Sequence, residues 1–130
     1  MAGITGLAHI GVHVYDMDES VDFYVNKLGF ELFESCELGA TKLRFLRAGT
    51  CIIELICNPD GKKWPNEGVV AHIAVEVKDI RTLVAELKAK GIQFRTEDVS
   101  VLPALFPTGS TNIFFDGPNG EALELYEFVS

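Results

Sequence analysis

The chain contains the sequence AHIGVHVYDM at residues 8–17 and the sequence AHIAVEVKDI at residues 71–80. Six of the ten residues are identical and occur in the same order, at an offset of 63 residues. In both copies apolar and polar residues alternate, which is typical of a half-buried β-strand. An internal repeat of this kind indicates two related modules, each of which begins with a strand that carries a histidine.

Each copy of the repeat runs into a helical pattern that ends at a glycine, Gly29 in the first module and Gly91 in the second. Glycine often ends a helix because it adopts the left-handed backbone conformation at little cost. Strand-like runs then follow at residues 30–37, 41–48 and 51–57, and at residues 92–98, 111–116 and 122–128. This order predicts an α+β fold in which two βαβββ modules form open mixed sheets around a cavity. The modules cover about residues 5–58 and 69–129 of a single domain that spans residues 1–130.

Stretches rich in proline and glycine mark the expected loops. One such stretch joins the two modules at residues 58–68. A second loop is expected at residues 99–110, which include Pro103, Pro107 and Gly109, and the sequence DGPNG at residues 116–120 predicts a turn before the last strand.

The composition excludes several classes of function. With 19 acidic and 11 basic residues among 130, the net charge is −8, so neither nucleic acid nor an anionic membrane surface is an expected partner. No apolar stretch reaches the roughly 18 residues of a transmembrane helix, and the initial residues MAGITG do not resemble a signal peptide. Cys36, Cys51 and Cys57 have no CxxC spacing, and we expect them to be reduced core residues of a cytoplasmic protein.

The two strand histidines occupy equivalent positions. Side chains of a strand alternate between its two faces. In the first copy of the repeat, Ile10, Val12 and Val14 form the face that can pack against the helix, so His9 points to the opposite face. The same alternation in the second copy directs His72 away from its helix.

The last strand of each module contains a carboxylate between apolar neighbours, Glu54 in CIIELIC and Glu124 in ALELYEF. A buried carboxylate without a partner is costly, so each is expected to bind a cation or to pair with a base. A single histidine or glutamate in a strand is usually structural, but four at equivalent positions favour a metal site. The candidate ligands of a divalent metal ion in the cavity are therefore His9, Glu54, His72 and Glu124.

Four further residues carry weaker predictions. His13 is predicted to contact the substrate or to support a ligand, and Glu76, on the face of the second histidine, is a weaker candidate ligand. Glu127 is out of phase with the carboxylate of its strand and is expected to be solvated. Trp64, in the loop between the modules, is either a loop anchor or a residue that contacts the ligand.

The chain resembles the vicinal oxygen chelate superfamily, which includes glyoxalase I, methylmalonyl-CoA epimerase, extradiol dioxygenases and the fosfomycin and bleomycin resistance proteins. The resemblance covers essentially the whole chain and implies the glyoxalase/bleomycin resistance fold. It rests on LAHI at residues 7–10, DFY at 22–24, LGF at 28–30, IEL at 53–55, AHIA at 71–74, DGPNG at 116–120 and LEL at 123–125.

Within the superfamily, the chain is most similar to bacterial glyoxalase I, a lactoylglutathione lyase. This likeness implies a nickel, zinc, manganese or cobalt ion held by the four candidate ligands. It also implies that Glu124 or Glu54 moves a proton next to a carbonyl group through an enediolate. The resemblance further implies a homodimer and a small-molecule substrate. It also implies that Asn58 and His13 bind the substrate.

The substrate is expected to differ from that of glyoxalase I. Where glyoxalase I has an arginine that binds the glutathione carboxylate, this chain has His13, and residues 99–110 include no lysine or arginine. A carboxylate is best bound by a cationic partner, preferably an arginine. A different thiol, a CoA thioester or a hydroxy-ketone is therefore expected to react better than a glutathione adduct.

Two alternatives stay open. The chain resembles a methylmalonyl-CoA epimerase, although that enzyme typically has a glutamine where Glu54 stands. The second alternative is a non-catalytic drug-binding protein of the same fold, which needs no metal ligands. Measuring the metal content therefore separates an enzyme from a drug-binding protein. Extradiol dioxygenases, which use two histidines and one glutamate around iron in a longer chain, rank lower.

Overall fold

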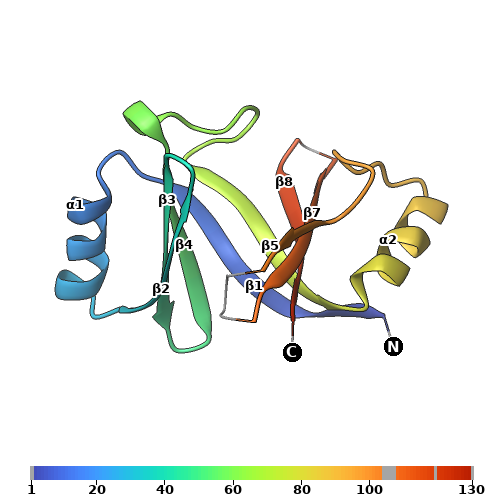
Figure 1. Ribbon diagram of the computed structural model, residues 1–130, viewed down its shortest axis with the longest axis horizontal. Helices are drawn as coiled ribbons and strands as arrows, with labels where there is room; N and C mark the ends of the chain where they lie inside the picture. Colours follow the sequence, from blue (N-terminus) through green and yellow to red (C-terminus); the bar gives the residue numbers. More distant parts are fainter. Residues whose placement is uncertain (1, 104–107, 119, 130) are drawn as a thin grey trace. The chain divides into compact units, whose positions relative to one another are not determined.

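The computed structural model describes residues 2–103, 108–118 and 120–129 (Figure 1). Two of the residues in the predicted loops, Pro107 and Asn119, lie outside these described residues. The chain forms two compact units. The first unit comprises His9–His72, and the second unit comprises Met1–Ala8 together with Ile73–Ser130. None of the helices in the described ranges is long and apolar enough to span a membrane.

The first unit contains the helix and the three strands that the sequence predicted. The end of β1 (Gly3–His13) is followed by α1 (Met17–Asp22), a π-helical turn (Phe23–Lys27), β2 (Glu31–Leu38), β3 (Thr41–Ala48) and β4 (Cys51–Cys57). The strand order is β2-β3-β4-β1. Strand β3 is antiparallel to both of its neighbours, and β1 is parallel to β4.

The helix of the first unit covers one face of its strands. The carboxylate of Asp16 accepts a hydrogen bond of 3.0 Å from the backbone N–H three residues later, which satisfies a donor that has no partner within the helix. From this cap, α1 buries Met17 against Leu46 of β3 and Leu55 of β4, and Val12 of β1 packs on the same side. The alternate residues of β1 are thereby directed to the other face, as predicted.

The second unit repeats this arrangement. It contains β5 (Val70–Lys78), whose first residues belong to the first unit, and α2 (Ile80–Ala89), β6 (Ser100–Leu102), β7 (Ser110–Asp116) and β8 (Ala122–Phe128). The strand order is β5-β8-β7-β6, in which β5 is parallel to β8, and β7 is antiparallel to β8 and β6. Helix α2 packs on the core of this unit, which includes Leu83, Val84, Ile113 and Leu125.

The strand predicted at residues 92–98 does not form. Phe94 makes an isolated bridge to Phe115, and the N–H of Arg95 donates a hydrogen bond to the Phe114 carbonyl (2.9 Å). The next four side chains, at residues 95–98, are polar and exposed, so the alternation that favours a half-buried strand ends there. The short strand β6 lies instead within the loop predicted at residues 99–110.

Glu127 has a structural role, which corrects the expectation that it is solvated. Its carboxylate accepts hydrogen bonds from the N–H groups of Asp79 (2.7 Å) and Ile80 (3.1 Å). These donors lie at the start of α2, where backbone N–H groups lack partners within the helix and a negative charge is favourable. Glu127 therefore joins β8 to the beginning of α2.

The three cysteines are free, as predicted, but they are not core residues. Cys51 is exposed, and Cys36 and Cys57 are half-buried. Cys51 is the first residue of β4 and follows the turn at Gly49, so it lies at the exposed end of the strand.

Candidate metal centre

The two glutamates singled out in the sequence occupy equivalent positions in the two sheets. Gly11 of β1 pairs with Glu54 of β4, and Ala74 of β5 pairs with Glu124 of β8. Gly11 and Ala74 are themselves equivalent positions of the sequence repeat. Each glutamate therefore has the same register relative to the histidine-bearing strand beside it.

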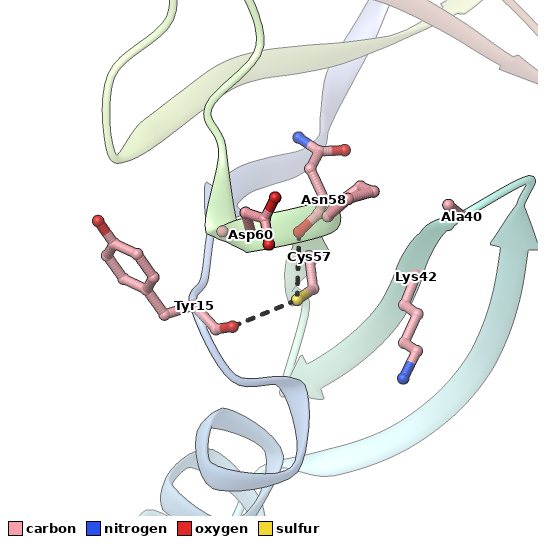
Figure 2. A pocket seen from close by; sticks show the side chains of 8 residues that line it. Tyr15, Ala40, Lys42, Cys57, Asn58 and Asp60 are labelled. Atoms are coloured by element: carbon pink, nitrogen blue, oxygen red, sulfur yellow. Dashed lines mark hydrogen bonds between the residues drawn. The ribbon is translucent and has the colours of Figure 1, made fainter.

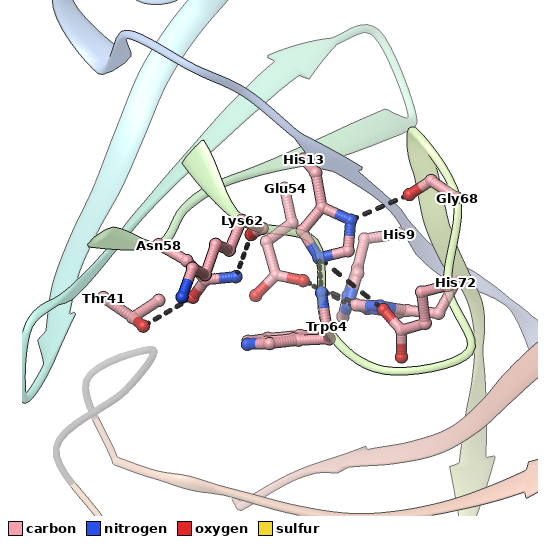
Figure 3. Close-up of polar contacts among 10 residues, drawn as sticks. His9, His13, Thr41, Glu54, Asn58, Lys62, Trp64, Gly68 and His72 are labelled. Atoms are coloured by element: carbon pink, nitrogen blue, oxygen red, sulfur yellow. Dashed lines mark hydrogen bonds and ion pairs between the residues drawn. The ribbon is translucent and has the colours of Figure 1, made fainter. Parts of the chain in front are cut away.

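Three of the four predicted ligands converge within the first unit (Figure 3). His9 Nε2 lies 3.2 Å from His72 Nε2. Glu54 Oε1 lies 3.3 Å from His9 Nε2 and 3.1 Å from His72 Nε2. The residues are only 2%, 6% and 3% exposed for His9, Glu54 and His72, respectively. The three atoms thus form a nearly equilateral triangle that is shielded from solvent.

This triangle has the dimensions of a set of metal ligands. Donor atoms about 2.1 Å from one ion lie about 3.0 Å apart at right angles and about 3.4 Å apart at the tetrahedral angle, and the three distances fall between these values. If hydrogen bonds alone held these three atoms together, each of the three pairs would need a proton between its two atoms. A single cation can interact favourably with all three electron-rich atoms at once. Two imidazole nitrogens and a carboxylate oxygen are typical ligands of divalent first-row metals. The residues present therefore fit a divalent metal ion.

The carboxyl group of Glu54 is ionised at neutral pH. Burial on its own would raise the pKa of this group, because the charged form loses hydration. The charge of His9, hydrogen bonds with His72 and His9, and the charge of His72 outweigh burial and lower the pKa from 4.5 to about 2. Glu54 is thus in the deprotonated form that metal binding requires.

His72 packs directly against the backbone of β1 at Gly11, a residue that the sequence analysis did not identify. A Cβ atom at position 11 would lie 2.5 Å from His72 Cε1 and 2.9 Å from His72 Nε2. Any side chain at this position would therefore displace the imidazole ring. The available signal was that the otherwise similar second copy of the repeat has Ala74 here.

Gly11→Ala is expected to weaken Zn²⁺ binding by about 10-fold or more, since disturbing the packing that orients a ligand costs about 10- to 100-fold in affinity. Isothermal titration calorimetry measures the change. Gly6→Ala is the matched control on the same strand, because a Cβ atom at position 6 would meet no atom within 4 Å. Equal affinities of the two variants would contradict the proposed effect of the close approach.

The fourth predicted ligand, Glu124, lies on β8 of the second unit and is 3% exposed. Its Oε2 atom accepts a hydrogen bond of 2.6 Å from Asn112 Nδ2 on the neighbouring strand β7. Asn112 was not predicted from the sequence, although an amide directly before the apolar residues IFF in STNIFFD was a usable signal. Asn112 orients the carboxylate of Glu124, whose role as a metal ligand stays a prediction.

His13 is buried and bound by the loop that follows β4. Its Nδ1 atom lies 2.8 Å from the Gly68 carbonyl oxygen, and its Nε2 atom lies 3.2 Å from the backbone nitrogen of Trp64 (Figure 3). Glu67 Oε1 is 3.7 Å from Nε2, which is beyond hydrogen-bonding distance. Backbone groups of the loop therefore engage both ring nitrogens, and the predicted substrate contact of His13 stays a prediction.

Asn58 is likewise held within the first unit. Its Oδ1 atom accepts a hydrogen bond from Thr41 Oγ1 (2.6 Å), and its Nδ2 atom donates one to the Lys62 carbonyl (2.8 Å). Asn58 also lines a cavity of about 520 Å³ (Figure 2). The described lining of this cavity consists of Tyr15, Ala40, Lys42, Cys57, Asn58, Pro59, Asp60 and Gly61. None of the three converging residues belongs to that lining, and the substrate-binding role of Asn58 stays a prediction.

Comparisons with known proteins agree with this fold. The chain is 34% identical to the uncharacterized protein YwkD of Bacillus subtilis, over 95% of this chain and 98% of that protein. It is 30% identical to a probable lactoylglutathione lyase of Synechocystis, over 95% and 96% of the two chains. The fold is similar to that of methylmalonyl-CoA epimerase from Mycobacterium tuberculosis, with a TM-score of 0.80, 23% identity, and coverage of 98% of this chain and 90% of that chain. Residues 6–125 match the Glyoxalase/Bleomycin resistance protein/Dioxygenase superfamily, and the chain belongs to this superfamily.

Proposed function

We propose that this protein is a divalent-metal-dependent lyase or isomerase, similar to glyoxalase I, that transfers a proton next to a carbonyl group. The superfamily includes metal-dependent lyases and isomerases as well as non-catalytic members. The observation that carries the proposal is the convergence of His9, Glu54 and His72, three buried ligand types within 3.1–3.3 Å of one another. A binding protein without catalysis has no need for such a set.

In the proposed mechanism, His9, Glu54 and His72 hold the metal ion, which when bound polarises oxygen atoms of the substrate as a Lewis acid. Glu124 removes a proton from the carbon next to the carbonyl group. The electron pair of the broken C–H bond forms a C=C bond as the carbonyl oxygen takes the negative charge, which gives an enediolate. Glu124 returns the proton to the former carbonyl carbon, and the hydroxyl proton of the first carbon moves to the neighbouring oxygen, so that the carbonyl and hydroxyl groups exchange places. The assignment of Glu124 rests on its equivalence to Glu54 and on its burial, and the hydrogen bond from Asn112 orients its carboxylate.

The proposed substrate is a hydroxy-ketone, a CoA thioester or an adduct of a thiol other than glutathione. The support is chemical: His13, at the position of the arginine expected in glyoxalase I, is engaged through both ring nitrogens by backbone groups. A histidine bound in this way cannot replace the bidentate contact of an arginine with a carboxylate. Weak activity on the glutathione hemithioacetal of methylglyoxal is therefore expected.

An epimerase reaction on a CoA thioester is the second candidate, and the fold similarity to methylmalonyl-CoA epimerase favours it. Both reactions begin with removal of a proton next to a carbonyl group. They differ in the carbon that receives the proton, because an epimerase returns it to the same carbon. The position of the deuterium label after reaction in D₂O therefore separates the two candidates.

The decisive experiment combines metal analysis with solvent exchange. The protein is purified, its metal content is measured, and the metal-loaded protein is incubated in D₂O with α-hydroxy-carbonyl compounds and CoA thioesters. Deuterium on the carbon that loses its proton, or on the neighbouring carbon that receives one, is the expected result. If no compound exchanges and a hydrophobic drug binds tightly without turnover, the protein is a drug-binding member of the superfamily.

We also expect the protein to be a homodimer. In the second unit, Ile4 and Leu7 of β1 are 59% and 50% exposed, and Ile73 of β5 is 39% exposed. A second copy would bury such apolar side chains, and homodimers are the commonest soluble assemblies. Light scattering at micromolar concentration is expected to give twice the 14.3 kDa of one chain. A species of 14.3 kDa alone would contradict this expectation.

A further inference from the structure

The loop between β4 and β5, residues 58–69, is bound by one residue of β1, His13. We call this segment the joining loop. The N–H of His13 donates a hydrogen bond to the Val69 carbonyl (2.8 Å). Its ring contacts the Gly68 carbonyl oxygen and the Trp64 backbone nitrogen, at 2.8 and 3.2 Å. One residue of β1 thus binds the joining loop at three points.

These contacts define which ring nitrogen of His13 donates a hydrogen bond and which accepts one. A carbonyl oxygen can only accept a hydrogen bond, so Nδ1 donates its proton to Gly68. A backbone N–H can only donate, so Nε2 accepts the hydrogen bond from Trp64 and carries no proton. Both ring nitrogens of His13 are therefore engaged by backbone groups of the joining loop. The repeat has Glu76 at the corresponding position, so this function is specific to the first copy.

The joining loop places the indole ring of Trp64 beside the metal ligand His72. The two rings are nearly parallel, with an interplanar angle of 14° and centroids 6.3 Å apart. The ring of His13 contacts the same indole edge-on, with centroids 5.5 Å apart at 90°. Figure 3 shows Trp64 beside the group formed by His9, Glu54 and His72. The orientation of the His72 ring is thus bounded by Trp64 as well as by the backbone of Gly11.

We propose that His13 and Trp64 are positioning residues for the metal ligand His72: His13 fixes the joining loop, and the loop holds the indole ring against the imidazole. Trp64 acts on His72 directly, whereas His13 acts only through Trp64. The three ligand atoms lie within 3.1–3.3 Å of one another. Preorganised ligands bind a metal ion more tightly because less conformational freedom is lost on binding. This inference rests on the metal site of the proposed function.

The experiment measures Zn²⁺ affinity by calorimetry for the full chain and five variants. His13→Phe keeps an aromatic ring beside Trp64 but removes both ring hydrogen bonds, and Trp64→Leu removes the indole. Each is expected to weaken Zn²⁺ binding by about 10-fold or more, the range found when groups that orient metal ligands are removed. His13→Gln is expected to restore most of the affinity, because one amide can accept from Trp64 and donate to Gly68. Lys63→Ala, an exposed position of the joining loop, is the control that should bind as the unchanged protein.

The double variant of His13→Phe and Trp64→Leu distinguishes positioning from a general loss of stability. If His13 acts through Trp64, the double variant binds Zn²⁺ no more weakly than Trp64→Leu alone. Additive losses, or unchanged affinity in both single variants, would overturn the inference. Should His13→Phe fail to fold, as circular dichroism would reveal, the affinities of Trp64→Leu and His13→Gln still decide the question.

A spectroscopic measurement supplies a readout that a purely structural role would not change. Trp64 is the single tryptophan of the chain, so Co²⁺ binding is expected to quench the fluorescence of the whole protein. In His13→Phe, quenching at saturating Co²⁺ should decrease, and the visible absorption of bound Co²⁺ should change as the His72 ring is reoriented. If the unchanged protein binds neither Zn²⁺ nor Co²⁺, the proposed function fails. If it binds both and the variants match it in affinity and spectrum, only the present inference fails.

Discussion

Replacing Glu124 with glutamine is expected to reduce turnover by about 10²- to 10⁴-fold, the usual contribution of a positioned general base. Glutamine has nearly the same shape as glutamate, and its side-chain oxygen can still accept the hydrogen bond from Asn112 Nδ2. The fold and much of the metal affinity should therefore persist while the base is lost. Proton exchange at the substrate carbon in D₂O, measured on metal-loaded protein, checks this expectation.

Glu127→Gln is the matched control, since it makes the same chemical change on the same strand. Glu127 contacts the start of α2, so its replacement is expected to affect stability and to leave turnover unchanged. Glu54→Gln provides the complementary test. We expect Glu54→Gln, unlike Glu124→Gln, to bind the metal ion more weakly, because Glu54 Oε1 belongs to the triangle of ligand atoms. If Glu54→Gln instead keeps its metal and loses turnover, while Glu124→Gln stays active, the base is Glu54.

Replacing His72 with alanine is expected to reduce Zn²⁺ affinity by more than about 100-fold. Loss of a direct ligand should cost more than the 10- to 100-fold typical of the groups that support ligands. The loss of metal binding is also expected to be visible in the unfolding temperature. Metal present at about 1,000 times its Kd stabilises a protein by about 4 kcal/mol, which corresponds to roughly 15 °C for a chain of this length. This increase should occur for the unchanged protein, should be reversed by a chelator, and should be absent in His72→Ala.

Glu76→Ala is the control for this prediction, because Glu76 lies on the same strand and was a weaker candidate ligand. It does not belong to the cluster of potential ligands among the described residues, so its replacement should preserve metal binding. Tight, stoichiometric binding of zinc, nickel or manganese by His72→Ala would place the metal site elsewhere.

Much of the fold could be predicted because it depends on local patterns. The alternation of polar and apolar residues identified β1 and β5, and glycines identified the ends of the helical segments. The strand predicted at residues 92–98 was wrong, since exposed polar residues follow Phe94 and only one isolated bridge forms. The role of Glu127 was also missed. Its partners at the start of α2 are distant in sequence, and no local pattern relates them.

The sequence by itself determined the repeat, the two equivalent pairs of histidine and glutamate, and the superfamily to which they point. These features follow from the period of two residues in a strand, which specifies which side chains share a face without specifying which strands are neighbours. Only the tertiary structure decided that His9, Glu54 and His72 meet within 3.1–3.3 Å, that Gly11 makes room for the His72 ring, and that His13 binds the joining loop. Each of these contacts depends on the pairing of strands or loops that lie tens of residues apart. Their register is set by packing of the whole unit, because shifting a strand by one residue would turn its buried side chains to the opposite face.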